Sequence, residues 1–298
     1  MTETCPICQA AETAPLGAYR NESTVLSGLT KRECSACGMV FASPMPSPEV
    51  WDAYNASYFE TAHGSATDSP RARLFREGLA KVRVAQVLDQ IGTPAPLRVI
   101  EVGAGYGEFM QDYCARVSGA DYGVVDTDAA AREMLSAKGA TVYADLMDAP
   151  SDHDLLVLSH VLEHTRDPAG FLGACLSRLQ PGAHVFIDVP CRDDLYKSGD
   201  EPHLLFFDKP AMAHLLGQVG LREIEIGYFG HTHATLQGDL ARPQLLARGL
   251  NGARRALAQA MGAGPSILPK SERVVLAPFA ADRKQPRRAR WLRAMAVK

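Results

Sequence analysis

The segment that decides the fold is Val99-Ile-Glu-Val-Gly-Ala-Gly-Tyr-Gly-Glu108, in which an apolar run leads into three glycines at alternate positions. Glycine is needed where the backbone turns tightly and where a ligand approaches main-chain N–H groups with no Cβ in the way. The segment therefore predicts a strand that ends in a nucleotide-type pocket. A dinucleotide-binding turn would have its third glycine at position 108, and a phosphate loop would contain Gly-Lys-Ser/Thr; the sequence has neither.

A second strand and a second acid follow at the spacing of a βαβ unit. Tyr122-Gly-Val-Val-Asp126 is a β-branched strand that ends in a carboxylate about 20 residues after the glycines, where an acid lies beside ribose hydroxyls. A third strand ends before Asp145, and the apolar run 154–159 is typical of a strand buried in a parallel sheet. A crossover helix is predicted by apolar residues at helical spacing: Phe109, Met110, Tyr113, Cys114 and Val117.

The pattern Glu101-x-Gly-x-Gly-x-Gly107, followed by Asp126, resembles motif I of class I S-adenosylmethionine (SAM) methyltransferases. The resemblance covers roughly residues 93–230 and the last eight residues. It implies an α/β fold with a Rossmann-like sheet of seven strands. The last strand, here Trp291–Lys298, would insert antiparallel between strands five and six.

The resemblance also implies the contacts of SAM. The acid after the second strand would bind the ribose, the acid after the third the adenine amine, and the loop after the fourth would face the sulfonium. A Tyr-x-x-x-Tyr segment, here Tyr54 and Tyr58, often covers the methionine end in relatives, although packing of a small cap explains the same pair. The implied cofactor-binding residues are Tyr58, Glu101, Gly103, Ala104, Gly105, Tyr106, Gly107, Asp126, Thr127, Asp145, Leu146, Ser159 and His160.

The rest of the chain fits this order of elements. Asp167-Pro168 predicts the start of a helix whose apolar stripe runs to Leu179, and strands are predicted over 184–189 and 221–228. Ahead of the sheet, residues 71–91 predict a helix that turns the following residues inward: Leu74, Phe75, Leu79, Val82 and Leu88.

Histidines that follow the later strands are candidates for the chemical step. Methyl transfer is an in-line displacement, and an acceptor that carries a proton must lose it, a task that histidine performs near neutral pH. Glu201-Pro-His203-Leu-Leu-Phe-Phe207 resembles the family's His-x-x-x-Phe segment, in which the histidine often holds a loop. The predicted acceptor base is His203, or alternatively His231 or His233, whereas His164 is expected to be structural or to belong to the cofactor loop.

Four cysteines near the N-terminus have the spacing of a zinc ribbon. Cys5-Pro-Ile-Cys8 and Cys34-Ser-Ala-Cys37 form two CxxC pairs, and two intervening residues let both thiolates of a pair reach one tetrahedral ion. Two disulfides are the alternative, but they belong to secreted domains, and the N-terminus does not read as a signal peptide. We therefore predict Zn²⁺ on Cys5, Cys8, Cys34 and Cys37.

Composition narrows the class of protein. A net charge of −3 and a pI near 6.3 give no general attraction for polyphosphates. The chain has no 18-residue apolar run, so we expect a cytoplasmic protein that makes no membrane contact. One basic cluster precedes the last strand and predicts either a solvated linker or a phosphate site: Arg283, Lys284, Arg287, Arg288, Arg290 and Arg293.

The predicted organisation is a zinc ribbon over 1–42, a linker and helical cap over 43–92, and a Rossmann-like methyltransferase domain over 93–298 with a helical insertion at 231–290. The predicted function is SAM-dependent methylation of an oxygen or nitrogen of a small molecule or sugar-type metabolite in a biosynthetic pathway. The resemblance extends to methyltransferases of natural-product and polysaccharide pathways, including zinc-bearing nucleotide-sugar C-methyltransferases, although the Tyr-His-rich substrate motif of that group does not occur here.

Two other functions remain open. Some RNA base methyltransferases also carry zinc ribbons, but residues 1–42 contain three Lys/Arg against four Asp/Glu, which argues against a nucleic-acid partner. A zinc-ribbon interaction module on a degenerate fold is the other alternative. The intact glycines and Asp126 argue against it.

Overall fold

The computed structural model describes residues 4–21, 26–54, 69–92, 98–262, 264, 273, 276, 279 and 282–298. Tyr58, one of the predicted cofactor contacts, lies outside these residues. Among the helices of the described residues, none is long and apolar enough to cross a membrane.

The larger sheet has eight strands in the order β11-β10-β12-β8-β7-β4-β5-β6. The five strands from β8 to β6 in this order are parallel, whereas β12 pairs antiparallel with both β8 and β10. This confirms the predicted sheet with its last strand inserted between the fifth and the sixth; the short β11 adds an edge strand. The strands are β4 (Arg98–Val102), β5 (Asp121–Val125), β6 (Thr141–Tyr143), β7 (His153–Ser159), β8 (Leu179–Pro190), β10 (Arg222–Thr232), β11 (Lys284–Gln285) and β12 (Ala289–Val297).

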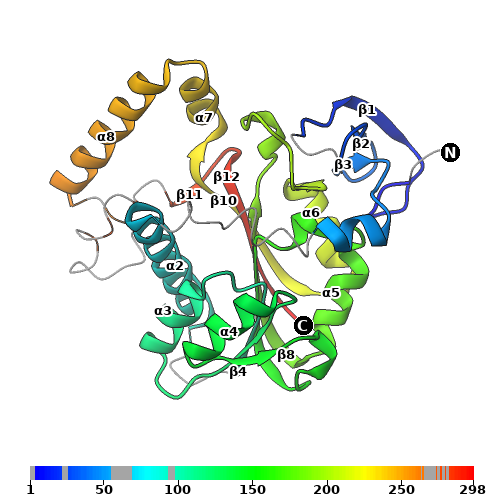
Figure 1. Cartoon of the computed structure of the whole chain (residues 1–298), viewed down its shortest axis with the longest axis vertical. Coiled ribbons are helices and arrows are strands. Elements are labelled where there is room, and N and C mark those ends of the chain that lie inside the picture. The colour runs from blue at the N-terminus through cyan, green and yellow to red at the C-terminus, as the bar shows by residue number, and fades with distance from the viewer. Residues whose placement is uncertain are drawn as a thin grey trace.

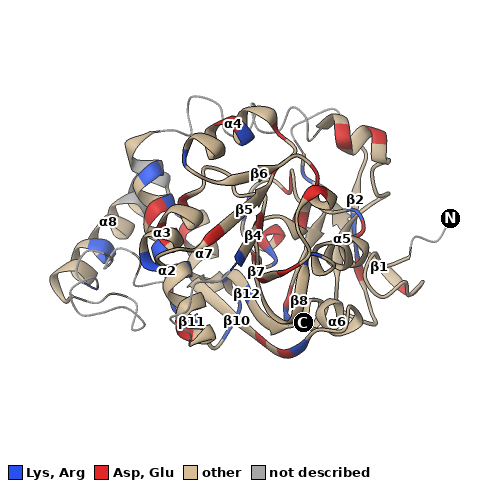
Figure 2. Ribbon diagram, turned by 90° about the horizontal axis from the view of Figure 1, so that it is seen from below, with Lys and Arg blue, Asp and Glu red and all other residues tan. Residues whose placement is uncertain are grey.

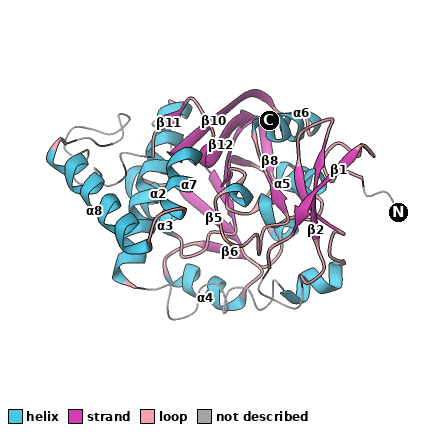
Figure 3. Cartoon of the chain, turned by 90° about the horizontal axis from the view of Figure 1, so that it is seen from above, coloured by secondary structure: helices cyan, strands magenta, loops and turns pink. Residues whose placement is uncertain are grey.

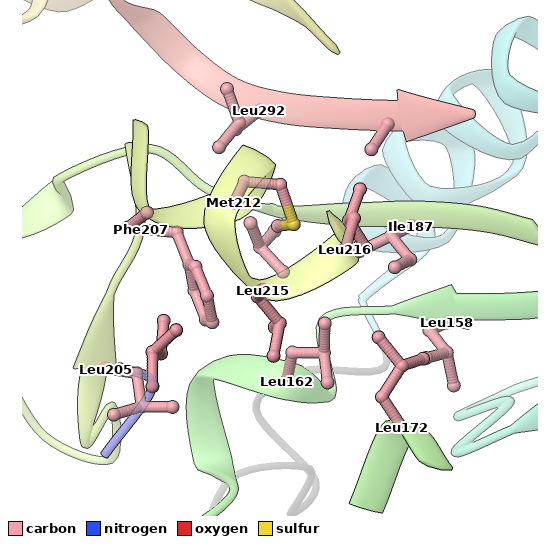
Figure 4. Close-up of a cluster of buried hydrophobic side chains, with 14 of the residues drawn as sticks. Leu158, Leu162, Leu172, Ile187, Leu205, Phe207, Met212, Leu215, Leu216 and Leu292 are labelled. Carbon is pink, nitrogen blue, oxygen red and sulfur yellow. The ribbon is translucent and has the colours of Figure 1, made fainter. Parts of the chain in front are cut away.

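Different helices cover the two faces of this sheet (Figure 1). Leu155 and Val157 of β7 belong to the apolar cluster that includes α2 and α3, and Leu156 and Leu158 to the cluster that includes α5 and α6 (Figure 4). A strand covered on both faces needs apolar residues at every buried position, which explains the continuous apolar residues 155–158. The helices are α2 (Pro70–Ile91), α3 (Glu108–Arg116), α4 (Ala129–Ala137), α5 (Pro168–Leu176) and α6 (Lys209–Gln218).

Two local predictions differ from the structure. Helix α5 ends at Leu176, and Leu179 is the first residue of β8 rather than part of a helical stripe. Leu74 and Phe75 are 66% and 36% exposed, although their spacing predicted an inward face. The buried positions of α2 begin only after its first two turns, with Gly78 and Leu79.

A smaller sheet lies at the N-terminal end of the molecule (Figures 1 and 3). Its strands β1 (Thr13–Ala18), β2 (Thr30–Cys34) and β3 (Val40–Ser43) come from the predicted ribbon, but its fourth strand, β9 (Leu205–Phe206), comes from the main domain. One apolar cluster contains residues from both parts, such as Ile7 and Leu215. The ribbon therefore shares its core with the larger domain.

Helices α7 (His233–Leu240) and α8 (Gln244–Ala260) lie between β10 and β12 in the chain. Helix α7 packs against β10 and β12, whereas α8 extends away from the sheet at the opposite end of the molecule from β1 (Figures 1 and 3). Helix α8 contains arginines and no acidic residue, so its charged positions are all blue in Figure 2. Leu257 on α8 and Met261 at its C-cap are 61% and 71% exposed.

Candidate active site

A cavity of about 790 Å³ opens at the carboxyl ends of β4, β5 and β7, where open α/β sheets bind their ligands. Its wall combines the glycine-rich turn, the residues after β5 and β7, helix α2 and Trp51. Most of the predicted cofactor set lines this one cavity: Glu101, Gly103, Ala104, Gly105, Tyr106, Asp126, Thr127, Ser159 and His160.

The three glycines of the turn all have positive φ, but their surroundings differ. A Cβ at Gly103 would lie 2.9 Å from Val161 Cγ2, and one at Gly107 would lie 2.8 Å from Leu135 Cδ2, so these two glycines allow close packing. A Cβ at Gly105 would meet no protein atom within 4 Å, and Gly105 lines the cavity. The middle glycine thus leaves open space that a ligand can use.

Two carboxylates lie near the carboxyl ends of β4 and β5, Glu101 within β4 and Asp126 directly after β5. Glu101 is 2% exposed and accepts a hydrogen bond from Tyr122 Oη (2.8 Å); burial raises the pKa of Glu101 to about 7. Asp126 accepts a hydrogen bond from the Asp128 backbone N–H on one oxygen (2.9 Å), and burial raises the pKa of Asp126 as well. Both line the cavity, so polar ligand groups within reach meet acceptor oxygens there.

His160 follows β7 with φ +60°, a backbone conformation that residues with side chains seldom adopt. Its Nε2 lies 3.0 Å from Arg83 Nη2, and its Nδ1 lies 3.2 Å from Glu163 Oε1. Because an arginine only donates, Nε2 of His160 is the acceptor in that contact. Strained residues of this kind concentrate at functional sites.

A chain of buried charges holds Arg83 in place. Arg83 Nε lies 2.5 Å from Asp188 Oδ2, which Arg293 also contacts at 2.9 Å, and Arg293 in turn contacts Asp282 at 3.0 Å. Arg293 is 2% exposed, so this member of the basic cluster before β12 is a buried ion-pair partner rather than part of a surface phosphate site. Arg288 is paired too, with Asp208.

His203 lines the same cavity, is 6% exposed, and has its Nδ1 2.8 Å from Asp193 Oδ2. Burial alone would raise the pKa of Asp193, but the charges of His203 and Lys197 outweigh it and hold the pKa well below its usual range. The ring of His203 packs edge to face on His164, with centroids 5.0 Å apart. Burial lowers the pKa of His164 to about 4, so His164 is neutral at pH 7.

The structure does not bring every predicted residue to this cavity. Gly107 caps α3, while Asp145 accepts a hydrogen bond from the Met147 backbone at the start of the 3₁₀ turn Leu146–Asp148; none of Gly107, Asp145 and Leu146 is among the lining residues. His231 and His233 also lie outside the lining. His233 is buried, with Nε2 2.9 Å from the Cys191 carbonyl oxygen.

Arg83 and Trp51 line the cavity although they belong to no recognised motif. Arg83 lies on α2, far from the glycine turn in sequence, and its only sequence signal is a charge among the apolar residues of a predicted helix. Trp51 lies after the ribbon and donates a hydrogen bond from Nε1 to the His164 carbonyl oxygen (2.8 Å). Its ring stacks on Tyr54 at 5.1 Å, which places this predicted tyrosine behind the cavity wall.

Two groups of potential metal ligands occur among the residues that the structure describes. In the first, Cys5 Sγ lies 3.6 Å from Cys37 Sγ and Cys8 Sγ lies 3.5 Å from Cys34 Sγ, close to the roughly 3.8 Å that a tetrahedral Zn–S₄ site requires. The four thiols therefore fit a zinc ion. In the second group, Glu163, His164 and His203 have their ligand atoms within 4.8 Å of one another, with the two imidazole rings packed edge to face.

Comparison with known proteins identifies the family. A family model described as "Methyltransferase domain" matches residues 73–226, more than half of the chain. The curated relatives include ubiquinone biosynthesis O-methyltransferases of Ralstonia nicotianae, 34% identical over 114 residues, and Stutzerimonas stutzeri, 31% identical over 111 residues. Each match covers 34% of this chain and 48% of the relative, so the chain spans about half the length of the curated relatives it matches.

Solved structures agree on the fold. The Burkholderia thailandensis 1,6-didemethyltoxoflavin-N1-methyltransferase with bound S-adenosylhomocysteine (SAH) has a TM-score of 0.51 and 15% identity, and the match covers 94% of this chain and 99% of that one. A possible histamine N-methyltransferase of Thermotoga maritima also has a TM-score of 0.51, with 12% identity over 82% of this chain and 99% of that one. The chain belongs to the methyltransferase-domain family. Its fold is that of SAM-dependent methyltransferases, which confirms the enzyme class predicted from the glycine motif.

Proposed function

We propose that this enzyme transfers the methyl group of SAM to an oxygen of a small hydroxylated molecule. The observation that carries the proposal is a single cavity lined by the open glycine turn, by Asp126 and by His203, whose ring contacts the buried Asp193. Bound SAM supplies an electrophilic methyl group on its sulfonium.

The glycine turn and Asp126 fit the nucleoside part of SAM. The free oxygen of Asp126 is available to the ribose hydroxyls, and the space above Gly105 lets the ligand approach the backbone. Ser159 and His160, at the end of β7, lie where the resemblance places the sulfonium. In this arrangement the acceptor enters beside His203, His164 and Trp51.

His203 is the proposed proton acceptor. Its Nδ1 faces the Asp193 carboxylate, so Nε2 is the nitrogen left to accept a proton from the acceptor hydroxyl, and the buried carboxylate stabilises the imidazolium that forms. The neutral His164 ring supports the His203 ring without adding a competing charge. His231 and His233 are not proposed as bases, because they lie outside the cavity lining.

Oxygen is favoured as the methylated atom because the curated relatives are named O-methyltransferases. A nitrogen acceptor is the second possibility, since the B. thailandensis structure is named as an N1-methyltransferase. We do not favour an RNA acceptor, because the basic side chains of the ribbon already contact residues of this chain and are not free for phosphates. Arg20 and Lys31 pair with Asp200, and Arg32 donates to Thr13. We also propose that the four ribbon thiolates hold one structural Zn²⁺.

Calorimetry with SAH and a methyl-transfer assay over catechols, hydroxy acids, sugars and amines would test this function. His203→Ala is expected to lower kcat by about 10²- to 10⁴-fold with SAH affinity preserved. His214→Ala is the matched control, because His214 is an exposed histidine on α6. Failure of the wild-type protein to bind SAH would disprove the function, and wild-type turnover in His203→Ala would remove His203 from the mechanism.

A further inference from the structure

The segment that carries His203 is built into the ribbon as well as into the main domain. Strand β3 pairs with β9 through Val40 with Phe206 and Phe41 with Leu205, and the Ala42 backbone N–H donates to the Leu204 carbonyl oxygen at 2.8 Å. Strand β9 begins two residues after His203. The ribbon sheet therefore continues directly into the backbone beside the proposed base.

Three ribbon side chains hold the turn before His203. Tyr19, 4% exposed, donates from Oη to the His203 carbonyl oxygen at 3.0 Å. The guanidinium of Arg20 pairs with the Asp200 carboxylate. The Arg20 backbone N–H also donates to Asp200 Oδ2, and the Asp200 backbone N–H donates to the Arg20 carbonyl oxygen, both at 2.7 Å. Lys31 Nζ lies 2.9 Å from the same carboxylate, which is completely buried. Charge-assisted hydrogen bonds of this kind are stronger than neutral ones and add geometric specificity.

The main domain holds the same segment from the other side. The Leu204 backbone N–H donates to the Glu163 carbonyl oxygen (2.8 Å), and Asp193 contacts the His203 ring. The His203 segment is thus held by the ribbon, through Tyr19 and β3, and by the main domain, through Asp193 and the Glu163 carbonyl oxygen.

The ribbon strands involved depend on the thiol cluster. Cys34 is the last residue of β2, and Cys37 lies three residues before β3, so a metal on these thiolates closes the hairpin that presents Lys31 and β3. A segment of this size cannot form a stable core alone, so a metal bound to the four thiolates would supply folding free energy in addition to that of docking on the larger domain.

We propose that the ribbon is a positioning element of the active site, in which Tyr19 and β3 fix the backbone of His203 so that its ring faces the acceptor. This inference rests on the proposed role of His203. It assigns the ribbon to the acceptor half of the reaction, because the contacts of Tyr19, Arg20, Lys31 and β3 given above all fall on residues 200–206.

Tyr19→Phe tests the hydrogen bond with the smallest change, since only the hydroxyl is lost. We expect kcat to fall by about 3- to 10-fold, with KM for SAM, SAH affinity and Tm near wild-type values. Tyr143→Phe, a partly buried tyrosine on the edge strand β6, is the matched control. An unchanged kcat in Tyr19→Phe, or equal losses in both variants, would overturn the role of Tyr19.

Metal removal from the full chain tests the ribbon as a whole. After chelation, amide hydrogen exchange is expected to accelerate at Leu204–Phe206 but not at Val99–Val102, while SAH affinity stays within about twofold and kcat falls. Unchanged exchange at β9, or loss of SAH binding together with kcat, would overturn the inference. If His203→Ala keeps full activity, the proposed base is wrong, whereas the exchange result still reports whether the ribbon holds this segment.

Discussion

Replacing Gly105 with alanine tests whether this glycine is needed for cofactor binding or only for the fold. The new Cβ would meet no protein atom within 4 Å, so the cost to the unliganded fold is that of the backbone conformation at φ +55°, about 1–2 kcal/mol. The same methyl group would enter the cavity that Gly105 lines. Overpacking of that size costs about 1–3 kcal/mol, which corresponds to about 5- to 150-fold weaker SAH binding.

Gly92→Ala is the matched control for this experiment. Gly92 has φ +65°, no atom within 4 Å of its ideal Cβ, and a position at the end of α2 outside the cavity lining. Both variants should lose similar stability in urea titrations, and calorimetry should show weaker SAH binding only for Gly105→Ala. Equal SAH dissociation constants in the two variants would refute the assignment of the glycine turn to the cofactor.

Further expected results concern the acids and the thiols. Asp126→Ala should weaken SAH binding by about tenfold or more, because a charge-assisted hydrogen bond contributes roughly 1.5–3 kcal/mol; calorimetry that shows unchanged affinity would contradict this. Burial raises the pKa of Glu101 from 4.5 to about 7. Ionisation of Glu101 therefore leaves the free energy of unfolding unchanged below pH 4.5, lowers it progressively as the pH rises, and lowers it by the full amount above pH 7. Relative to Glu101→Gln, wild-type stability in urea should therefore fall by about 2–3 kcal/mol between pH 5 and pH 8, and parallel profiles would show that the carboxyl is not buried as described. Elemental analysis should find about one zinc per chain, and Cys8→Ser should reduce it; a metal-free protein with a protease-resistant N-terminus would contradict the zinc site.

The sequence determined those features that local backbone chemistry controls. Three alternate glycines after an apolar strand specify a turn with positive φ, and the acid of Asp126 at βαβ spacing then falls at the same sheet edge. The paired CxxC segments likewise predicted the cluster of four thiols. In each case the information lies within one short segment, or in a spacing that the regular geometry of the fold converts into distance.

Only the tertiary structure decided which distant residues meet. The sequence favoured His203 as the base and left His231 and His233 as alternatives, but of these three only His203 lines the cavity, because the ribbon strand β3 and the buried Asp193 hold its segment there. Arg83 enters the site from α2 because a buried chain of ion pairs through Asp188 directs it toward His160. Such contacts join segments far apart in the chain and depend on packing and charge compensation in three dimensions, for which the spacing of residues along the sequence gives no measure.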